Sequence, residues 1–169
     1  MAKIGFIGMG NMGYAILKGL LNEYGKEEII FTDVNPGRCR QVSEETGVSF
    51  AACNAECAAS AKYIVLAVKP QFFAPVLSDI AGTVTKDHII ISIAPGITVD
   101  SVRETLGADK RIVRAMPNTP ALLGEGMTGV CYDPALFAKE EQETIRSLFE
   151  SFGKMQTVEE RLMNAVVCV

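Results

Sequence analysis

The stretch that decides the fold is KIGFIGMGNMG, residues 3–13. The apolar run from Ile4 to Ile7 predicts a buried strand, and apolar residues recur at helical spacing from Tyr14 to Leu21. Three glycines with the spacing G-x-G-x-x-G lie between these two segments. The order strand, glycine turn and helix is the order that dinucleotide binding requires. The sequence therefore predicts a dinucleotide site at this turn, although such turns also occur for purely structural reasons.

Each glycine of the turn has a separate expected role. Gly8 permits the tight turn, Gly10 leaves room for a pyrophosphate, and Gly13 lets the helix pack closely on the strand. The N-terminus of the helix adds free N–H groups and the positive end of its dipole. Together these features predict an anion site at the start of the first helix.

Composition narrows the class of protein. The chain has 169 residues, 49% of them hydrophobic, and a formal net charge of −4. This length and apolar content predict one ordinary globular core rather than disorder, and the negative charge argues against a nucleic-acid partner. The longest apolar runs, at 63–68 and 89–93, have the length of strands rather than of membrane spans. We expect a cytoplasmic protein with no membrane partner.

The cysteines and the single histidine indicate neither a metal site nor a catalytic centre. No histidine or second cysteine pair completes a zinc set, so we expect no metal and interpret the thiols as reduced and structural. The single histidine, His88, precedes an apolar run and is expected at the entry to a strand, which disfavours hydrolase mechanisms that need a histidine. The five cysteines are Cys39, Cys53, Cys57, Cys131 and Cys168.

The second expected strand, 28–32, ends at an acidic residue. Asp33 follows the third glycine of the turn at about the distance expected of an acid that binds the ribose hydroxyls, which favours NAD. Arg38 lies just beyond, and the turn Asn35-Pro36-Gly37 would present it to a 2′-phosphate, which favours NADP. Asp33 is also consistent with a simple turn residue. Local chemistry leaves the choice between NAD and NADP open.

The remaining chain alternates strands and helices. Such alternation predicts a doubly wound, Rossmann-type α/β sheet that is mostly parallel, with antiparallel terminal strands as a variant and the start of a helix at the C-terminal end. Further strands are expected at 48–51, 62–68, 89–93, 111–115, 125–132 and 154–158, and further helices at 35–46, 55–61, 71–81, 98–106, 133–152 and 159–169.

Two loops follow strands at the edge where parallel sheets bind ligands. Lys69 and Pro70 close the strand 62–68, and Lys69 is either a ligand contact or a solvated loop lysine. Met116-Pro117-Asn118-Thr119-Pro120 closes the strand 111–115, where the two prolines make the loop stiff and present an Asn-Thr pair. This loop is either part of a site or a rigid structural turn.

Four motifs together resemble the N-terminal domain of the pyrroline-5-carboxylate reductases, which catalyse the last step of proline biosynthesis. They are IGFIGMGNMG at 4–13, AVKP at 67–70, SIAPGIT at 92–98 and RAMPNTP at 114–120. The first is shared with hydroxyisobutyrate and 6-phosphogluconate dehydrogenases, whereas the second and fourth are more specific. The resemblance covers the whole chain.

The resemblance implies a role for each motif. A small residue is usual where Pro95 stands, and Asp33 is unexpected in a member that prefers NADP; the cofactor implied is NADP, with NAD as the alternative because of Asp33. The implied pyrophosphate residues are Gly8, Met9, Gly10, Asn11, Met12 and Gly13. The implied contacts of the ribose and adenylate are Asn54, Val68, Lys69 and Pro70. Ala94 and Pro95 are implied near the nicotinamide, and Met116, Pro117 and Asn118 at the substrate.

The resemblance also implies that the chain is one part of a longer enzyme. Residues 1–158 would be the cofactor domain, and 159–169 the start of a helix leading to an absent helical domain that dimerises and holds most catalytic residues. The three residues 167–169 differ from the polar and small residues usual there. The implied reaction is the reduction of 1-pyrroline-5-carboxylate to L-proline, performed poorly or not at all by this chain alone.

Three alternatives remain at this stage. A β-hydroxyacid dehydrogenase would share the first motif but lack the Met-Pro-Asn-Thr-Pro loop. A deazaflavin-linked NADP reductase would also share the first motif. The third alternative is a nucleotide-binding module without activity of its own, such as a redox sensor or a scaffold.

Overall fold

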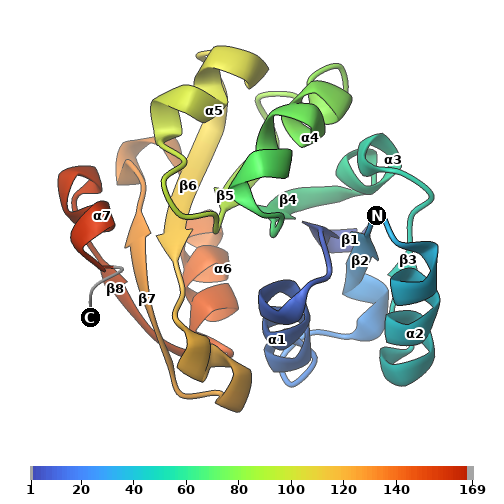
Figure 1. The fold of residues 1–169 in the computed structure, drawn as a ribbon. Helices are drawn as coiled ribbons and strands as arrows, with labels where there is room; N and C mark the ends of the chain where they lie inside the picture. The colour runs from blue at the N-terminus through green and yellow to red at the C-terminus, as the bar shows by residue number, and fades with distance from the viewer. Residues whose placement is uncertain (1, 167–169) are drawn as a thin grey trace.

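The structure is a computed structural model that describes residues 2–166. Its centre is an eight-stranded sheet in the order β3-β2-β1-β4-β5-β6-β7-β8 (Figure 1). The strands are β1 Ala2–Ile7, β2 Ile29–Thr32, β3 Ser49–Phe50, β4 Ala61–Leu66, β5 Ile89–Ser92, β6 Arg111–Met116, β7 Gly126–Cys131 and β8 Gly153–Thr157.

Helices cover both faces of the sheet. Apolar side chains of α1, α2 and α6 form one core with one face, and those of α3, α4 and α5 form a second core with the other face. Two cores on opposite faces of a mostly parallel sheet define the doubly wound α/β architecture. The helices are α1 Asn11–Leu20, α2 Pro36–Thr46, α3 Asn54–Ala59, α4 Phe73–Ile80, α5 Val99–Leu106, α6 Lys139–Glu150 and α7 Met163–Val166.

The strand directions confirm the predicted sheet. β1 to β6 run parallel to one another, β7 is antiparallel to β6, and β8 is parallel to β7. The last two strands therefore run against the other six. The strand order reverses at β1, which lies between β2 and β4. In sheets of this type a ligand crevice opens at such a switch point, outside the carboxyl ends of the strands.

One predicted helix begins later than expected. Instead of continuing from Asp133, the chain makes a short 3₁₀ turn at Pro134–Leu136, becomes extended at Phe137, and enters α6 at Lys139. The extended backbone lets the buried ring of Phe137 pack edge-on against Tyr132, with centroids 5.2 Å apart. The prediction of a continuous helix over 133–152 is wrong because burial of this ring outweighs local helix propensity.

Two other helices differ at their ends. The helix predicted from residue 71 begins as a 3₁₀ turn over Pro70–Phe72 before α4. The helix predicted over 159–169 consists of a 3₁₀ turn, Glu160–Leu162, and α7. The part of that prediction on Val167, Cys168 and Val169 lies outside the described residues.

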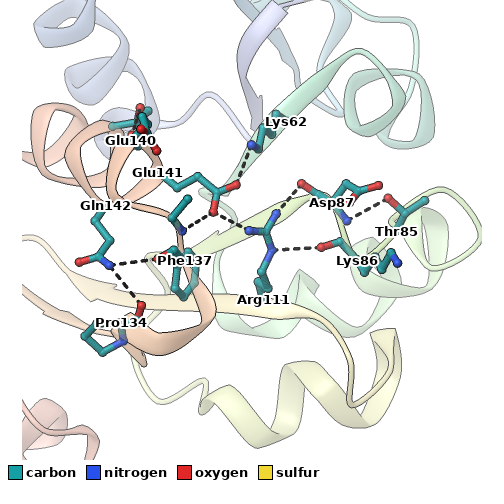
Figure 2. A network of polar contacts seen from close by, with 12 residues as sticks. Lys62, Thr85, Lys86, Asp87, Arg111, Pro134, Phe137, Glu140, Glu141 and Gln142 are labelled. Carbon is teal, nitrogen blue, oxygen red and sulfur yellow. Dashed lines mark hydrogen bonds and ion pairs between the residues drawn. The ribbon is translucent and has the colours of Figure 1, made fainter.

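The amino edge of the sheet is fastened by a buried carboxylate (Figure 2). Glu141 of α6 lies 2.6 Å from both Lys62 Nζ and Arg111 NH1. Arg111 also donates to the carbonyl oxygens of Lys86 and Asp87. Because these residues belong to β4, the loop before β5, β6 and α6, the network joins four segments at the edge opposite the ligand crevice.

His88 has a structural position. Its Nδ1 accepts from the backbone N–H of Thr85 at 3.0 Å, and its Nε2 lies 3.1 Å from the carbonyl oxygen of Ala58. Both ring nitrogens are thus engaged next to the first residue of β5. This confirms the predicted place at a strand entry.

Candidate functional site

The glycine turn has the geometry that its spacing predicts. Gly8 has φ +96°, and a Cβ there would lie 2.7 Å from the carbonyl oxygen of Ala67. A Cβ on Gly13 would lie 2.6 Å from the carbonyl oxygen of Gly8. No described atom lies within 4 Å of a Cβ built on Gly10. The fold therefore requires glycine at the first and third positions, whereas at Gly10 it leaves open space.

Two side chains form hydrogen bonds with the backbone of the glycine turn at Met9. The backbone N–H of Met9 donates to Asp33 Oδ2 at 2.7 Å, and Arg38 Nε donates to the carbonyl oxygen of Met9 at 2.8 Å. The side chain of Met9 is fully buried in the core. A second oxygen of Asp33, Oδ1, accepts from the N–H of Asn35. The loop is therefore fixed by the segment that follows β2.

The Arg38 side chain contacts other residues of the chain through its Nε, its NH1 and the face of its guanidinium. Its guanidinium stacks over the ring of Tyr14 at 4.8 Å, and its NH1 donates to Gln41. The hydroxyl of Tyr14 in turn donates to Glu45 at 2.7 Å, and this hydrogen bond raises the pKa of Tyr14. The chain of contacts joins the first turn of α1 to α2.

A first cavity of about 240 Å³ opens at the carboxyl ends of β1 and β2. Within it, Asn54 Nδ2 donates to Asp79 Oδ2 at 2.9 Å, so an amide of α3 and a carboxylate of α4 form one wall. The walls are otherwise mainly apolar, as expected of a site for a flat heterocycle. The lining residues are Ile7, Gly8, Asp33, Val34, Asn54, Val68, Phe72, Pro75, Val76 and Asp79.

A second cavity of about 430 Å³ lies on the other side of the glycine turn. It meets the N-terminus of α1, where the N-cap Gly10 offers no side chain to the first free N–H groups. Val68 lines both cavities, so the two hollows share a wall. The lining residues are Gly10, Asn11, Met12, Ala67, Val68, Lys69, Pro70, Ile93, Ala94, Pro95, Met116 and Pro117.

Most of the expected site residues line one of the two cavities, but four of them line neither. The side chain of Met9 is in the core, Gly13 lies beneath the turn, and Arg38 lines neither cavity. Asn118 also lines neither; its Oδ1 accepts from the N–H of Met127 at the start of β7. Lys69 and Pro70 line the second cavity rather than the first, which contains Asn54.

Sequence reasoning missed the contribution of α4, and of the 3₁₀ turn just before it, to the first cavity. Phe72, Pro75, Val76 and Asp79 follow the spacing 3, 1, 3, which is one face of a helix. This pattern directly follows the Lys69-Pro70 loop, so the spacing carried a usable signal. Phe72 leaves more than half of its surface exposed, at 56%, which is unusual for a ring that only packs in a core.

Metal and thiol chemistry are not built into this site. Across residues 2–166, no three His, Cys, Asp or Glu side chains gather as a metal site. Cys39 and Cys57 are buried, Cys131 is half-buried and Cys53 is exposed, all as free thiols. Burial raises the pKa of Cys57 to about 12. Cys168 lies outside the described residues.

Two adjoining cavities at a topological switch point, divided by a glycine turn at a helix N-terminus, define a Rossmann-type domain with a candidate dinucleotide site. Comparison with known proteins narrows this class. Residues 3–96 match the family described as NADP oxidoreductase, coenzyme F420-dependent. This match covers more than half of the chain, and the chain belongs to that family.

Over nearly its whole length the chain is similar to pyrroline-5-carboxylate reductases. It is 39% identical to the one from Escherichia coli K12, over 99% of this chain and 62% of that protein. The solved reductase from Coxiella burnetii matches with a TM-score of 0.92 at 31% identity, over 99% of this chain and 63% of that one. The Plasmodium falciparum pyrroline carboxylate reductase, solved with NADP bound, matches with a TM-score of 0.83 at 29% identity, over 96% and 59%.

These matches confirm the predicted resemblance and fold. The chain spans about 62% of the length of the curated reductase from Escherichia coli K12. No helix within residues 2–166 has the length and apolarity needed to cross a membrane.

Proposed function

We propose that this chain is the cofactor-binding part of a pyrroline-5-carboxylate reductase that uses a nicotinamide dinucleotide. The observation that carries the proposal is the pair of cavities at the carboxyl edge, joined at Val68 across the glycine turn. A dinucleotide has two heterocyclic ends linked by a pyrophosphate, and the arrangement offers two hollows linked by an anion site.

The first cavity suits the adenosine half. Val34, Phe72 and Val76 provide apolar walls for the adenine ring, and Asn54 offers an amide. The pyrophosphate is assigned to the turn, where Gly10 leaves open space in front of the free N–H groups of α1. Lys69 is exposed beside this point and supplies a positive charge.

The second cavity suits the nicotinamide and the substrate. Ala94 and Pro95 form one side, and Met116 and Pro117 form another. When bound, a reduced nicotinamide would supply a hydride to the C=N carbon of 1-pyrroline-5-carboxylate whose ring nitrogen is protonated, and the product of this iminium reduction is L-proline. The residues of this chain orient both rings and exclude water, because the cavity walls between these loops are mainly apolar.

The identity of the cofactor depends on residues of the first cavity. The family description and the NADP-bound relative favour NADP. The carboxylate of Asp33 lines the first cavity and would repel a 2′-phosphate, and Arg38 is already bound to Met9 and Gln41, which favours NAD as the second candidate.

The division of the whole enzyme is also part of the proposal. Residues 1–158 form the cofactor domain, and residues 159–169 begin the link to a helical domain that dimerises and supplies groups for the substrate carboxylate. The chain alone then binds cofactor in the cytoplasm but turns over substrate slowly. The alternative of a β-hydroxyacid dehydrogenase lacks a counterpart for the loop at 116–120.

Parallel titrations with NADPH and NADH, followed by nicotinamide fluorescence, test the proposal. Saturable binding of either supports it, and the tighter ligand identifies the cofactor. The control is Gly8→Val, which fills the turn where a Cβ already meets Ala67 at 2.7 Å. If neither dinucleotide binds a folded chain, the assignment of the two cavities is wrong. Addition of 1-pyrroline-5-carboxylate then measures whether the chain alone has reductase activity.

A further inference from the structure

A buried arginine lies on the strand that leads into the second cavity. Arg114 of β6 is 2% exposed, and its chain leads within two residues to Met116, a wall of that cavity. Its NH2 donates to Asn164 Oδ1 of α7 at 2.9 Å, and its NH1 lies 3.4 Å from Glu160 Oε1. A buried cation is costly unless it is paired and hydrogen-bonded, so these contacts determine how Arg114 sits.

The environment of Arg114 is only partly satisfied. Among the described residues, its Nε has no hydrogen-bond partner, and neither does the hydroxyl of Ser92, the residue opposite it on β5. Glu160 provides the one carboxylate paired with the guanidinium in the part of the chain that the structure describes. The position of this arginine therefore depends on a side chain from the segment before α7.

The same carboxylate oxygen holds a second segment. Glu160 Oε1 also accepts from the backbone N–H of Val99 at 2.9 Å. Val99 is the first residue of α5, the helix that follows the Ala94-Pro95-Gly96 loop. Glu160 Oε1 thus contacts α5, which follows the loop at 94–96. It also contacts Arg114 of β6, the strand that precedes the loop at 116–120.

We infer that Glu160 and Arg114 are positioning residues that set the spacing of the two loops around the second cavity. The inference rests on the proposed function, because it assigns these loops to the nicotinamide side of a dinucleotide. Neither residue lines either cavity, so both act through Ala94-Pro95 and Met116-Pro117. The segment before α7 is thereby coupled to the geometry of the nicotinamide site and not to the adenosine site.

Hydrogen exchange on the free chain tests the coupling without any ligand. In Glu160→Ala, amides of residues 96–100 and 115–119 should exchange about tenfold faster, while those of the glycine turn at 5–14 are unchanged. Glu160→Gln retains an acceptor oxygen and should restore most of the protection. Asn164→Ala removes only the other acceptor of Arg114, and should loosen 115–119 without affecting 96–100.

The matched control is Glu159→Ala, one residue away. Glu159 is exposed and pairs with Arg161 rather than with either loop, so this variant should exchange like the unaltered chain. Equal protection in Glu160→Ala and Glu159→Ala would overturn the inference, as would uniform loosening of all segments. Because this arm needs no cofactor, it remains decisive even if the proposed function fails.

Ligand binding provides the second arm. Glu160→Ala should weaken the reduced dinucleotide about fivefold, the scale of residues that act through their neighbours. The substitution should leave unchanged the binding of ADP-ribose, or of ADP-ribose 2′-phosphate, because these ligands lack the nicotinamide. Equal loss for both ligands would show a general structural effect, and the inference would be wrong.

Discussion

The backbone N–H of Met9 and the carboxylate of Asp33 are joined at 2.7 Å, across 24 residues of sequence. The acid that lines the first cavity is therefore also the brace of the glycine turn. The hydrogen bond that holds the loop and the contact with a ribose that the proposed function implies are separate roles. Asp33 can serve both because the end of β2 lies beside the turn after β1. The two roles can be separated by substitution.

Asp33→Ala removes both roles. Loss of the acceptor leaves the partly buried N–H of Met9 without its partner, and we expect a loss of about 1–3 kcal/mol in the free energy of unfolding. Removal of the negative charge should shift the ratio of the NADPH and NADH dissociation constants toward NADPH by about tenfold, equivalent to 1.4 kcal/mol. Urea denaturation and parallel fluorescence titrations measure the two effects.

Asp33→Asn serves as the matched variant for that experiment. Its amide oxygen can still accept from Met9, so stability should stay within about 1 kcal/mol of the unaltered chain. The shift toward NADPH should persist because the charge is gone. If selectivity is unchanged in both variants, Asp33 does not face the 2′ position.

Alanine should impair dinucleotide binding at Gly10 and fold stability at Gly13. A Cβ on Gly10 meets open space and its φ is −73°, so Gly10→Ala should change stability by less than about 1 kcal/mol. It should nevertheless weaken dinucleotide binding at least about tenfold, or 1.4 kcal/mol. Gly13→Ala forces a Cβ to 2.6 Å from a backbone oxygen and should cost roughly 1–3 kcal/mol in stability. Thermal melts measure the effect on stability, and fluorescence titrations measure the effect on binding. If Gly10→Ala binds the dinucleotide as well as the unaltered chain, the pyrophosphate does not lie at Gly10.

Glu141 makes stability depend on acid pH. Burial acts to raise the pKa of this carboxyl, but hydrogen bonds from Arg111, Lys62 and the N–H of Ala138 outweigh it and hold the pKa at about 2. A carboxyl with a lowered folded pKa stabilises the fold above its unfolded pKa, and this contribution is lost as pH falls toward the folded value. We expect up to about 3 kcal/mol at pH 7, declining between roughly pH 5 and pH 2.

The measurement compares Glu141→Gln with the unaltered chain in urea at several pH values. The difference in unfolding free energy should be largest near pH 7 and shrink below about pH 4. Glu140→Gln, at the neighbouring exposed position, provides the control and should show no such difference. A gap that stays constant with pH would assign the effect of Glu141 to packing instead of charge.

The free thiols should react in an order set by burial. Burial raises the pKa of Cys57 to about 12 and also raises that of Cys39, whereas Cys53 is exposed. Since the thiolate is the reactive form, iodoacetamide at pH 8 should label Cys53 first and leave Cys39 and Cys57 intact until urea is added. Peptide mass mapping identifies the sites, and Cys53→Ser should abolish the fast label among these three. Rapid labelling of Cys57 would contradict its buried position.

The sequence was most informative where backbone geometry requires a particular residue. Gly8 and Gly13 occur because their surroundings exclude a Cβ, and a spacing rule captures that requirement. The parallel strands were likewise visible as short apolar runs, because strands buried on both faces must be apolar throughout.

Features that depend on distant partners could not be predicted in this way. Arg38 is close enough in sequence to Asp33 to suggest a phosphate ligand, yet its guanidinium is taken up by Met9 and Tyr14 from another segment. The start of α6 depends on how the ring of Phe137 packs after folding. The pairing of Arg114 with Glu160 joins residues 46 apart, and no local pattern marks it.

Val68 forms a common wall of both cavities, and this has a consequence for affinity. A ligand that reaches both hollows makes its second contact within the same molecule, at an effective concentration set by the covalent link between its halves. A dinucleotide should thus bind far more tightly than its two mononucleotides mixed at equal concentration. For the same reason, an inhibitor that joins two weak fragments across Val68 should bind more tightly than either fragment alone.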